Sequence, residues 1–220
     1  GSEMCIRDSI SSDGSTIIFR WEFSSNGGVG WSSVVDGGGY SGSSTNTLSV
    51  DDDFAKNTYQ YRCKMETNTS VQPSYTNAAT LTVFRVITIS NQPTDQNPMA
   101  PATATFTVAA STLDTATIAY QWEKSENNDG SNFTSIGGAT GASYVTGATT
   151  YDADYGDYYR CVLSAQGASN VISTSARNLV QRTINITAQP TNETGAVGGT
   201  RSFGVAATTS DNDAGDITYQ

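Results

Sequence analysis

The sequence predicts an all-β fold built from consecutive two-sheet sandwiches, and three observations carry this prediction. The composition favours strands over helices, because the 220 residues include 31 threonines and only five leucines. Apolar residues alternate with polar ones between turn-rich stretches, which is typical of half-buried antiparallel strands. Short motifs also recur about one hundred residues apart, as expected for an array of similar domains.

The recurring motifs define the period of this array. The Gln-Pro-Thr at 92–94 returns at 189–191, and the Phe-x-Val that begins at Phe106 returns at Phe203, each 97 positions later. The period predicts a partial unit with the later strands at 10–85, a complete unit at 86–182 and a partial unit with the first strands at 183–220. We expect the partial units to be less stable than the complete one, because each lacks strands to cover its apolar face.

The joints between the predicted units read as short connections. Neither Phe84-Arg85-Val86 nor Val180-Gln181-Arg182 has the Gly, Pro or Ser run that a flexible linker normally needs. The last strand of one unit is therefore expected to pass almost directly into the first strand of the next. This continuity predicts a semi-rigid rod.

Residues 1–9 read as an assembly artefact rather than as protein sequence. The run Gly1-Ser2-Glu3-Met4-Cys5-Ile6-Arg7-Asp8-Ser9 resembles the translation of a transposon-based sequencing-library adaptor. We expect Cys5 to be part of this artefact, and we exclude the segment from the fold prediction. The chain also ends inside a predicted strand, so we expect a fragment cut at both ends; a genuine N-terminal tail is the alternative.

Seven strands are predicted in the complete unit from the alternation of apolar residues and the turns between them. Turn signals lie at Asn127-Asn128-Asp129-Gly130 and at the glycines 137, 138 and 141. The number, length and spacing of the strands suit a two-sheet sandwich. The predicted strands are 86–90, 102–110, 117–124, 132–136, 142–148, 157–165 and 172–180.

Three features of the complete unit resemble the immunoglobulin-like fold. Trp122 matches the family's core tryptophan, Asp154-Tyr155-Gly156 matches its Asp-x-Gly corner, and Tyr159-Arg160-Cys161 matches its Tyr-x-Cys strand. The partial unit before it repeats Trp21 and Tyr61-Arg62-Cys63, with Lys56 and Thr58 where the family has Asp and Gly. The resemblance covers about 210 residues and implies tandem immunoglobulin-like sandwiches.

The resemblance also implies that the intradomain disulfide of the family is absent. Val108 stands where the family's first cysteine would lie. Cys63 and Cys161 occupy equivalent positions in successive units, too far apart to pair with each other. We expect both to be small buried core residues; a reactive thiol or a metal ligand is the alternative.

The same comparison assigns the structural core. Tyr61 and Tyr159 hold the place of the family's tyrosine corner, whose hydroxyl bonds to nearby backbone. Trp31 aligns with Phe133 on a shorter strand near the sheet edge, so it is the candidate for stacking on a glycan; ordinary packing is the alternative. The expected core residues are Trp21, Trp122, Cys63, Cys161, Tyr61, Tyr159, Phe106 and Val108, with Tyr120 and Ile136 added in the complete unit.

Catalytic and metal-binding patterns are not found in the sequence. With no histidine, this chain cannot use a histidine base or histidine metal ligands. The acidic clusters at Asp51-Asp52-Asp53, at 152–154 and at 211–216 read as solvated turns, with calcium binding as the alternative. A net charge of −10 disfavours nucleic acid and anionic membrane surfaces as partners. We therefore expect no enzymatic activity, no cofactor and no metal.

Tandem units of this kind resemble repeats of bacteriophage tail, fibre or capsid proteins, and equally those of bacterial surface adhesins. The resemblance implies a structural and adhesive region of a larger protein at a virion surface, outside a cell or on a cell surface. Such a region acts as a spacer and a weak, multivalent binder of host-surface glycans or proteins, beside other subunits of a virion or surface assembly. An accessory module of a secreted polysaccharide-degrading enzyme is the alternative; an enzyme within these residues is the least favoured one.

Overall fold

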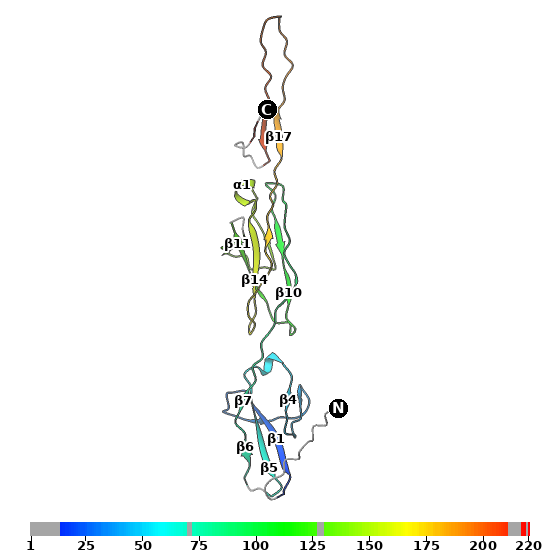
Figure 1. Cartoon of the computed structure of the whole chain (residues 1–220), viewed down its shortest axis with the longest axis vertical. Coiled ribbons are helices and arrows are strands. Elements are labelled where there is room, and N and C mark those ends of the chain that lie inside the picture. The colour runs from blue at the N-terminus through cyan, green and yellow to red at the C-terminus, as the bar shows by residue number, and fades with distance from the viewer. Residues whose placement is uncertain (1–13, 70–71, 127–129, 211–216, 219) are drawn as a thin grey trace. The chain divides into compact units, whose positions relative to one another are not determined.

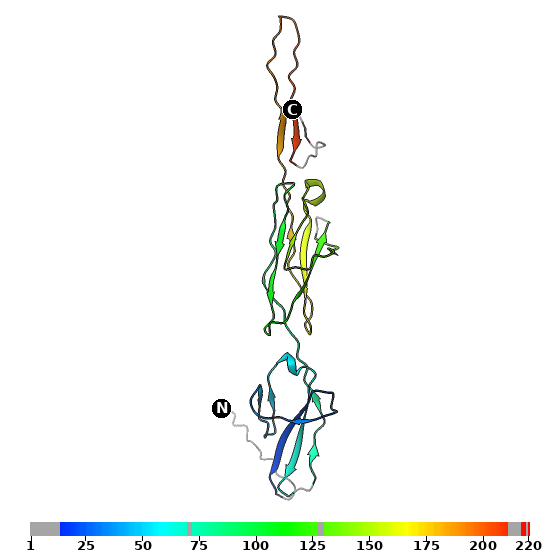
Figure 2. The same cartoon turned by 180° about the vertical axis from the view of Figure 1, so that it is seen from behind.

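The computed structural model describes residues 14–69, 72–126, 130–210, 217–218 and 220. These residues form antiparallel sheets with very little helix, so the predicted all-β, immunoglobulin-like fold is confirmed (Figures 1 and 2). The chain divides into two compact units, Gly1–Arg85 and Val86–Gln220. Residues 1–9, with Cys5, lie outside the described residues, as do Asp211, Asp213 and Asp216.

The second unit contains a sandwich that we call the middle sandwich, made of elements β8 to β16. Its first sheet joins β12 (Thr134–Ser135), β11 (Ala119–Ser125), β14 (Tyr158–Ser164) and β15 (Val171–Ile172), with β16 (Ala176–Arg177) also paired to β14. Its second layer consists of the pair β8 (Thr88–Asn91) and β10 (Ala109–Ser111) and the pair β9 (Thr105–Thr107) and β13 (Ser143–Val145). The one-turn helix α1 (Tyr151–Asp154) precedes β14.

The seven strands predicted for this sandwich are all present, two of them in two parts. The stretch 102–110 divides at Val108, because β10 pairs with β8 while β9 pairs with β13. The stretch 172–180 divides at Ser173, whose hydroxyl accepts a hydrogen bond from the Cys161 amide at 2.9 Å. The side chain thus supplies the hydrogen bond that the interrupted ladder lacks.

The sequence analysis missed one pairing in this sandwich. Gln96 and Met99 make parallel bridges to Asn178 and Gln181. Backbone hydrogen bonds of 2.7–2.9 Å join the two segments, from Ala100 and Gln96 among others. The bridges are isolated, so this edge has no regular strand whose alternation could have revealed it.

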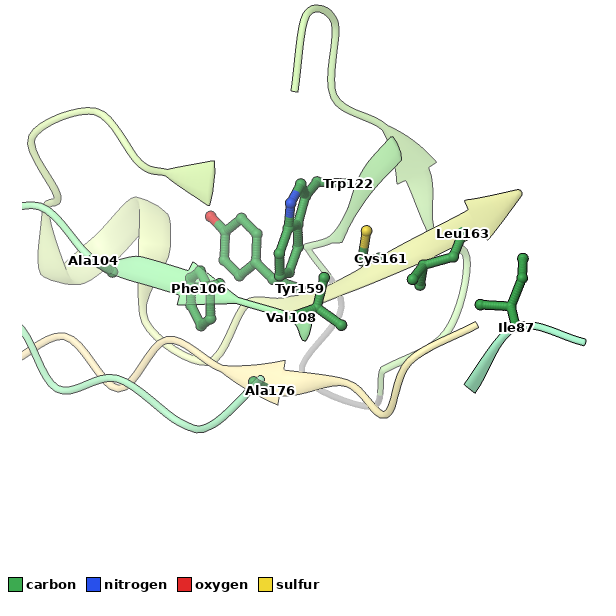
Figure 3. Packing of buried hydrophobic residues seen from close by; sticks show 9 residues of the cluster. All are labelled: Ile87, Ala104, Phe106, Val108, Trp122, Tyr159, Cys161, Leu163 and Ala176. Atoms are coloured by element: carbon green, nitrogen blue, oxygen red, sulfur yellow. The ribbon is translucent and has the colours of Figure 1, made fainter. Parts of the chain in front are cut away.

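The core lies between the two layers of the middle sandwich (Figure 3). Phe106 and Trp122 are fully buried, and the ring of Phe106 stacks on that of Tyr159 with centroids 4.5 Å apart. The indole nitrogen of Trp122 donates to the Gly141 carbonyl at 2.9 Å, so its polar atom is satisfied inside the core. The cluster of buried residues comprises Ile87, Ala104, Phe106, Val108, Trp122, Tyr159, Cys161, Leu163 and Ala176.

The first unit is built around two long strands, β1 (Ile17–Ser24) and β5 (Gln60–Thr67), which pair along their whole length. The short strands β2 (Ser32–Ser33), β6 (Ser74–Tyr75) and β7 (Ala79–Thr80) extend this sheet. A separate hairpin joins β3 (Tyr40–Ser41) and β4 (Ser49–Val50), and the 3-10 turn η1 (Phe54–Lys56) precedes β5. Among residues 14–69 and 72–85, no strand stands in the place of β8, β9 or β10.

A third element, the C-terminal hairpin, consists of β17 (Ile184–Ala188) and β18 (Ala206–Thr209). The two strands pair antiparallel, and every residue of β17 is exposed. No helix among the described residues has the length and apolar character that crossing a bilayer requires.

The two described cysteines are free and buried, as expected for sandwiches without the family's disulfide. Burial raises the pKa of the Cys161 thiol to about 11, and burial also raises the pKa of Cys63 above its usual value. Because the thiolate is the reactive form, both side chains are poor nucleophiles near neutral pH.

We expect Cys161 to resist alkylation in the folded chain. At pH 8 the raised pKa alone lowers its thiolate fraction about a hundredfold relative to an ordinary thiol, and full burial slows the reaction further. Iodoacetamide labelling, followed at each cysteine by mass spectrometry, should therefore be at least this much slower in buffer than in urea. Equal labelling rates in both solvents would contradict the burial of Cys161.

Candidate binding surface

Trp31, the candidate glycan contact, is half-buried at the edge of the first unit's sheet. It follows the turn after β1, and its indole nitrogen donates to the Gly28 carbonyl at 3.1 Å. The guanidinium of Arg62 lies 4.1 Å from the centre of the Trp31 ring and 4.4 Å from that of Tyr75. One arginine on β5 therefore contacts two aromatic rings, a cation–π arrangement that orders both.

An ion pair holds the arginine in this position. Glu22 on β1 stands directly opposite Arg62 on β5, and its carboxylate accepts a hydrogen bond from the guanidinium at 2.8 Å. Both side chains are largely shielded, with 25% of Arg62 and 17% of Glu22 exposed. A charge-assisted, cross-strand pair of this kind fixes the guanidinium more firmly than an exposed ion pair would.

The middle sandwich repeats this arrangement at equivalent positions. Arg160 on β14 pairs with Glu123 on β11 at 2.7 Å, and its guanidinium lies 3.9 Å from the centre of the Phe133 ring. Ile172 takes the register position that Tyr75 holds in the first unit, and it is exposed as Tyr75 is. We call the two sets together the arginine–aromatic surface: Glu22, Trp31, Arg62 and Tyr75 in the first unit, and Glu123, Phe133, Arg160 and Ile172 in the middle sandwich.

Sequence analysis identified Trp31 but missed the arginine and glutamate beside it. The signal was present, since each core tryptophan is followed by Glu and each Tyr-x-Cys has Arg as its middle residue. What the motif does not reveal is the strand register, which places Glu22 opposite Arg62 and Glu123 opposite Arg160.

Several acidic residues of the calcium candidates serve local structure instead. Asp53 caps η1 by accepting from the Ala55 amide at 2.9 Å, and Asp51 pairs with Lys56. Asp154 accepts from the Thr150 amide at 2.8 Å, and Asp152 lies 3.7 Å from Arg182. Over the described ranges, no three carboxylates or thiols gather as a metal site would require.

The remaining predicted core residues differ between the two units. In the middle sandwich Val108 and Tyr159 are buried with Phe106, Trp122 and Cys161, while Tyr120 and Ile136 are half-buried against that cluster. In the first unit Tyr61 and Cys63 are buried, but Trp21 is only half-buried.

The tyrosine pair at the family's corner position also departs from expectation in the first unit. The Tyr61 hydroxyl lies 3.3 Å from the hydroxyl of Tyr40, a side chain on β3, where the resemblance implied a backbone partner. Burial raises the pKa of Tyr61 and of Tyr159 well above the usual value for tyrosine. Both phenols therefore stay neutral at physiological pH and serve packing.

Comparison with solved structures finds chains of extracellular immunoglobulin domains, all of low identity. A structure of Dscam is 21% identical over 75% of this chain and 38% of its own length, with a TM-score of 0.37. Sidekick-1 immunoglobulin domains 1–5 are 14% identical over 87% of this chain and 38% of that one, with a TM-score of 0.39. Extracellular domains 3–5 of Drosophila OTK are 17% identical over 89% and 65%, with a TM-score of 0.33.

The chain thus spans about two fifths of the length of the Dscam and Sidekick-1 structures. No curated protein matches the sequence. One protein family, described as a domain of unknown function (DUF8696), matches residues 88–182. Residues 88–182, the stretch that folds as the middle sandwich, are therefore similar to that family.

Proposed function

We propose that this chain is a non-enzymatic, structural and adhesive repeat region of a larger surface-exposed protein. It acts as a spacer and as a weak, multivalent binder of glycans or proteins on a host surface. The observation that supports this is the recurrence of the arginine–aromatic surface, with the same Glu–Arg pair beside an aromatic ring in the first unit and in the middle sandwich. Several weak contacts of one kind on a single chain gain avidity through effective concentration.

The proposal includes the setting and the division of the chain. The parent protein is a bacteriophage virion protein of the tail, fibre or capsid, located at the virion surface beside other subunits. Within it, residues 10–85 and 183–220 belong to incomplete units, and 86–182 form a complete one. The net charge of −10 supports glycans or proteins as partners rather than nucleic acid or an anionic bilayer.

The first unit is the stronger binding position in this proposal, because it carries two aromatic rings beside its arginine. Tyr75 is 47% exposed, and Trp31 is held by its hydrogen bond to Gly28 and by Arg62. Rigid aromatic side chains give large contact area with little loss of conformational entropy, which is why they dominate binding hot spots. The Arg62 contact occupies part of each ring, so a ligand meets the remaining ring surface and edges.

Replacing Trp31 by alanine should therefore weaken binding to glycan arrays and to whole host cells by about tenfold or more, as truncation of an aromatic anchor does. The matched control is Phe84→Ala, which removes an aromatic ring that is 74% exposed but lies outside the arginine–aromatic surface. Circular dichroism checks that both variants keep their sheets. If the unmodified chain binds neither glycans nor cells, the adhesive role is wrong and only the spacer role remains.

A further inference from the structure

The first unit has an open apolar sheet face. Trp21 on β1 and Tyr61 on β5 stand at the positions that Trp122 and Tyr159 hold in the middle sandwich. There Phe106 on β9 covers both rings, with centroid distances of 6.3 Å to Trp122 and 4.5 Å to Tyr159. Among residues 14–69 and 72–85 no side chain takes the place of Phe106, and Trp21 is accordingly only half-buried.

A hollow of about 210 Å³ lies at this position in the first unit. Apolar and aromatic side chains line it, among them Trp21, Leu48, Val50, Tyr61 and Leu81. A dry cavity of about 150 Å³ already accommodates a benzene ring, so this hollow is large enough for a phenylalanine side chain. Beside it, the strand β4 is hydrogen-bonded to β3 alone within the described part of the chain, which leaves one β4 edge to pair.

The C-terminal hairpin is the counterpart of what the first unit lacks. In the middle sandwich β8 pairs with β10 through Thr88 with Ser111 and Ile89 with Ala110, and a bulge follows. Shifted by the repeat of 97 residues, the same pairs recur in β17 and β18 as Asn185 with Thr208 and Ile186 with Ala207, again followed by a bulge. The hairpin therefore reproduces the first two strands of a sandwich, in register.

The apolar side chains of this hairpin have nothing to pack against. Phe203 is 68% exposed and Val205 is 47% exposed, whereas their equivalents Phe106 and Val108 are 0% and 1% exposed. Ile184 and Ile186 on the paired strand are also exposed, at 65% and 56%. Contiguous exposed apolar residues of this kind mark an interaction surface.

We propose that the C-terminal hairpin of one copy of this chain docks onto the open sheet face of the first unit of a second copy and completes its sandwich. Phe203 then enters the hollow beside Trp21 and Tyr61, as Phe106 packs on Trp122 and Tyr159. The backbone next to Phe203 pairs with the free edge of β4, as β9 pairs with β13. Backbone pairing supplies affinity and the side-chain pockets supply specificity, as in other cases of strand addition.

The polarity of the middle sandwich favours two copies over closure within one. The chain enters this sandwich beside Leu163 and leaves it after Arg177, which pairs with Tyr158, so entry and exit lie at opposite ends of β14. The contact joins two different surfaces, which makes it heterologous, and each added copy offers a new open face. Assembly is therefore head to tail and concentration-dependent. This inference does not depend on the proposed adhesive role.

Sedimentation equilibrium of the reduced, purified chain tests the proposal, with a reductant present so that Cys5 forms no disulfide. Between about 1 µM and about 1 mM, where weak complexes assemble, the weight-average mass should rise above 23.1 kDa through species of two and more chains. A mass of 23.1 kDa throughout this range would overturn the proposal.

Two exposed positions of the hairpin separate specific docking from general stickiness. Phe203→Asp should weaken assembly at least about tenfold, because a carboxylate cannot enter the apolar hollow without losing its hydration. Val197→Asp, at a fully exposed residue between the paired strands, is the matched control and should change assembly less than about twofold. Equal effects of the two variants would contradict docking through Phe203.

A mixing experiment tests both surfaces at once and tolerates local unfolding of the acceptor. Leu48→Asp blocks the hollow of the first unit and leaves the hairpin intact, whereas Phe203→Asp does the reverse. Each variant alone should remain at 23.1 kDa, and an equimolar mixture should form a complex of two chains and nothing larger. A mixture that stays monomeric, or one that forms long assemblies, would show that the hairpin and the hollow are not partners.

Discussion

Replacing Trp122 by alanine is expected to destabilise the middle sandwich by about 3–5 kcal/mol, the usual range for a large buried aromatic residue. Trp122 is fully buried, its ring lies between Phe106 and Tyr144 at centroid distances of 6.3 and 6.4 Å, and its indole nitrogen bonds to Gly141. The variant therefore loses packing against both layers and leaves a buried carbonyl without its donor. Small domains have a total stability of about 5–15 kcal/mol, so much or all of it is lost.

Urea unfolding and hydrogen exchange across residues 86–182 measure this effect. The matched control is Leu113→Ala in the same sandwich, since Leu113 is fully exposed and its removal should leave the free energy of unfolding nearly unchanged. A melting temperature that falls by less than about 5 °C in Trp122→Ala would be inconsistent with Trp122 as the centre of the core.

Introducing cysteine at Val108 is expected to have an effect of similar size and opposite sign. Val108 and Cys161 are 1% and 0% exposed, come from opposite layers and lie next to each other in the core (Figure 3). Position 108 is where the immunoglobulin-like resemblance places the first cysteine of the family's bridge. Under oxidising conditions Val108→Cys should therefore form a disulfide with Cys161 and stabilise the sandwich by about 2–5 kcal/mol.

The stabilisation should depend on the covalent bond and disappear when the bond is reduced. Without the bond, Val108→Cys is a small core change that costs about 1 kcal/mol or less. The double variant Val108→Cys with Cys161→Ala cannot form the bridge and serves as the control in oxidant. Unfolding midpoints with and without reductant, together with a thiol titration, distinguish these cases; a variant that stays reduced in oxidant would show that the two positions do not meet.

The resemblance to the immunoglobulin-like fold rested on few residues and still predicted most of the middle sandwich. Trp122 and Cys161 are cross-strand neighbours on β11 and β14, as their family positions imply. The strands were predictable because half-buried strands alternate apolar and polar residues, and β14 shows this alternation along its whole length. The parallel edge at Gln96 and Met99 was missed because isolated bridges leave no periodic pattern.

The candidate surface was only partly predictable for a related reason. Trp31 stands out as an aromatic residue on a short edge strand, but its contact with Arg62 depends on how β1 and β5 pair. A ladder shifted by two residues would keep every side chain on the same face and would separate Glu22 from Arg62. Register is set by the whole sheet and its turns, so a motif read along one strand does not contain it.

By itself, the sequence determined the all-β class, the repeat near one hundred residues, the positions of the strands and the absence of the family's disulfide between 108 and 161. These follow from periodicity and from residue identity, which are local properties of the chain. Only the tertiary structure decided that Arg62 and Arg160 each hold an aromatic ring, that Trp21 lies beside an open hollow, and that Phe203 is exposed while Phe106 is buried. Phe106 and Phe203 occupy equivalent places in the repeat, so the burial of each depends on which sheet lies opposite it, and packing between layers alone supplies that sheet.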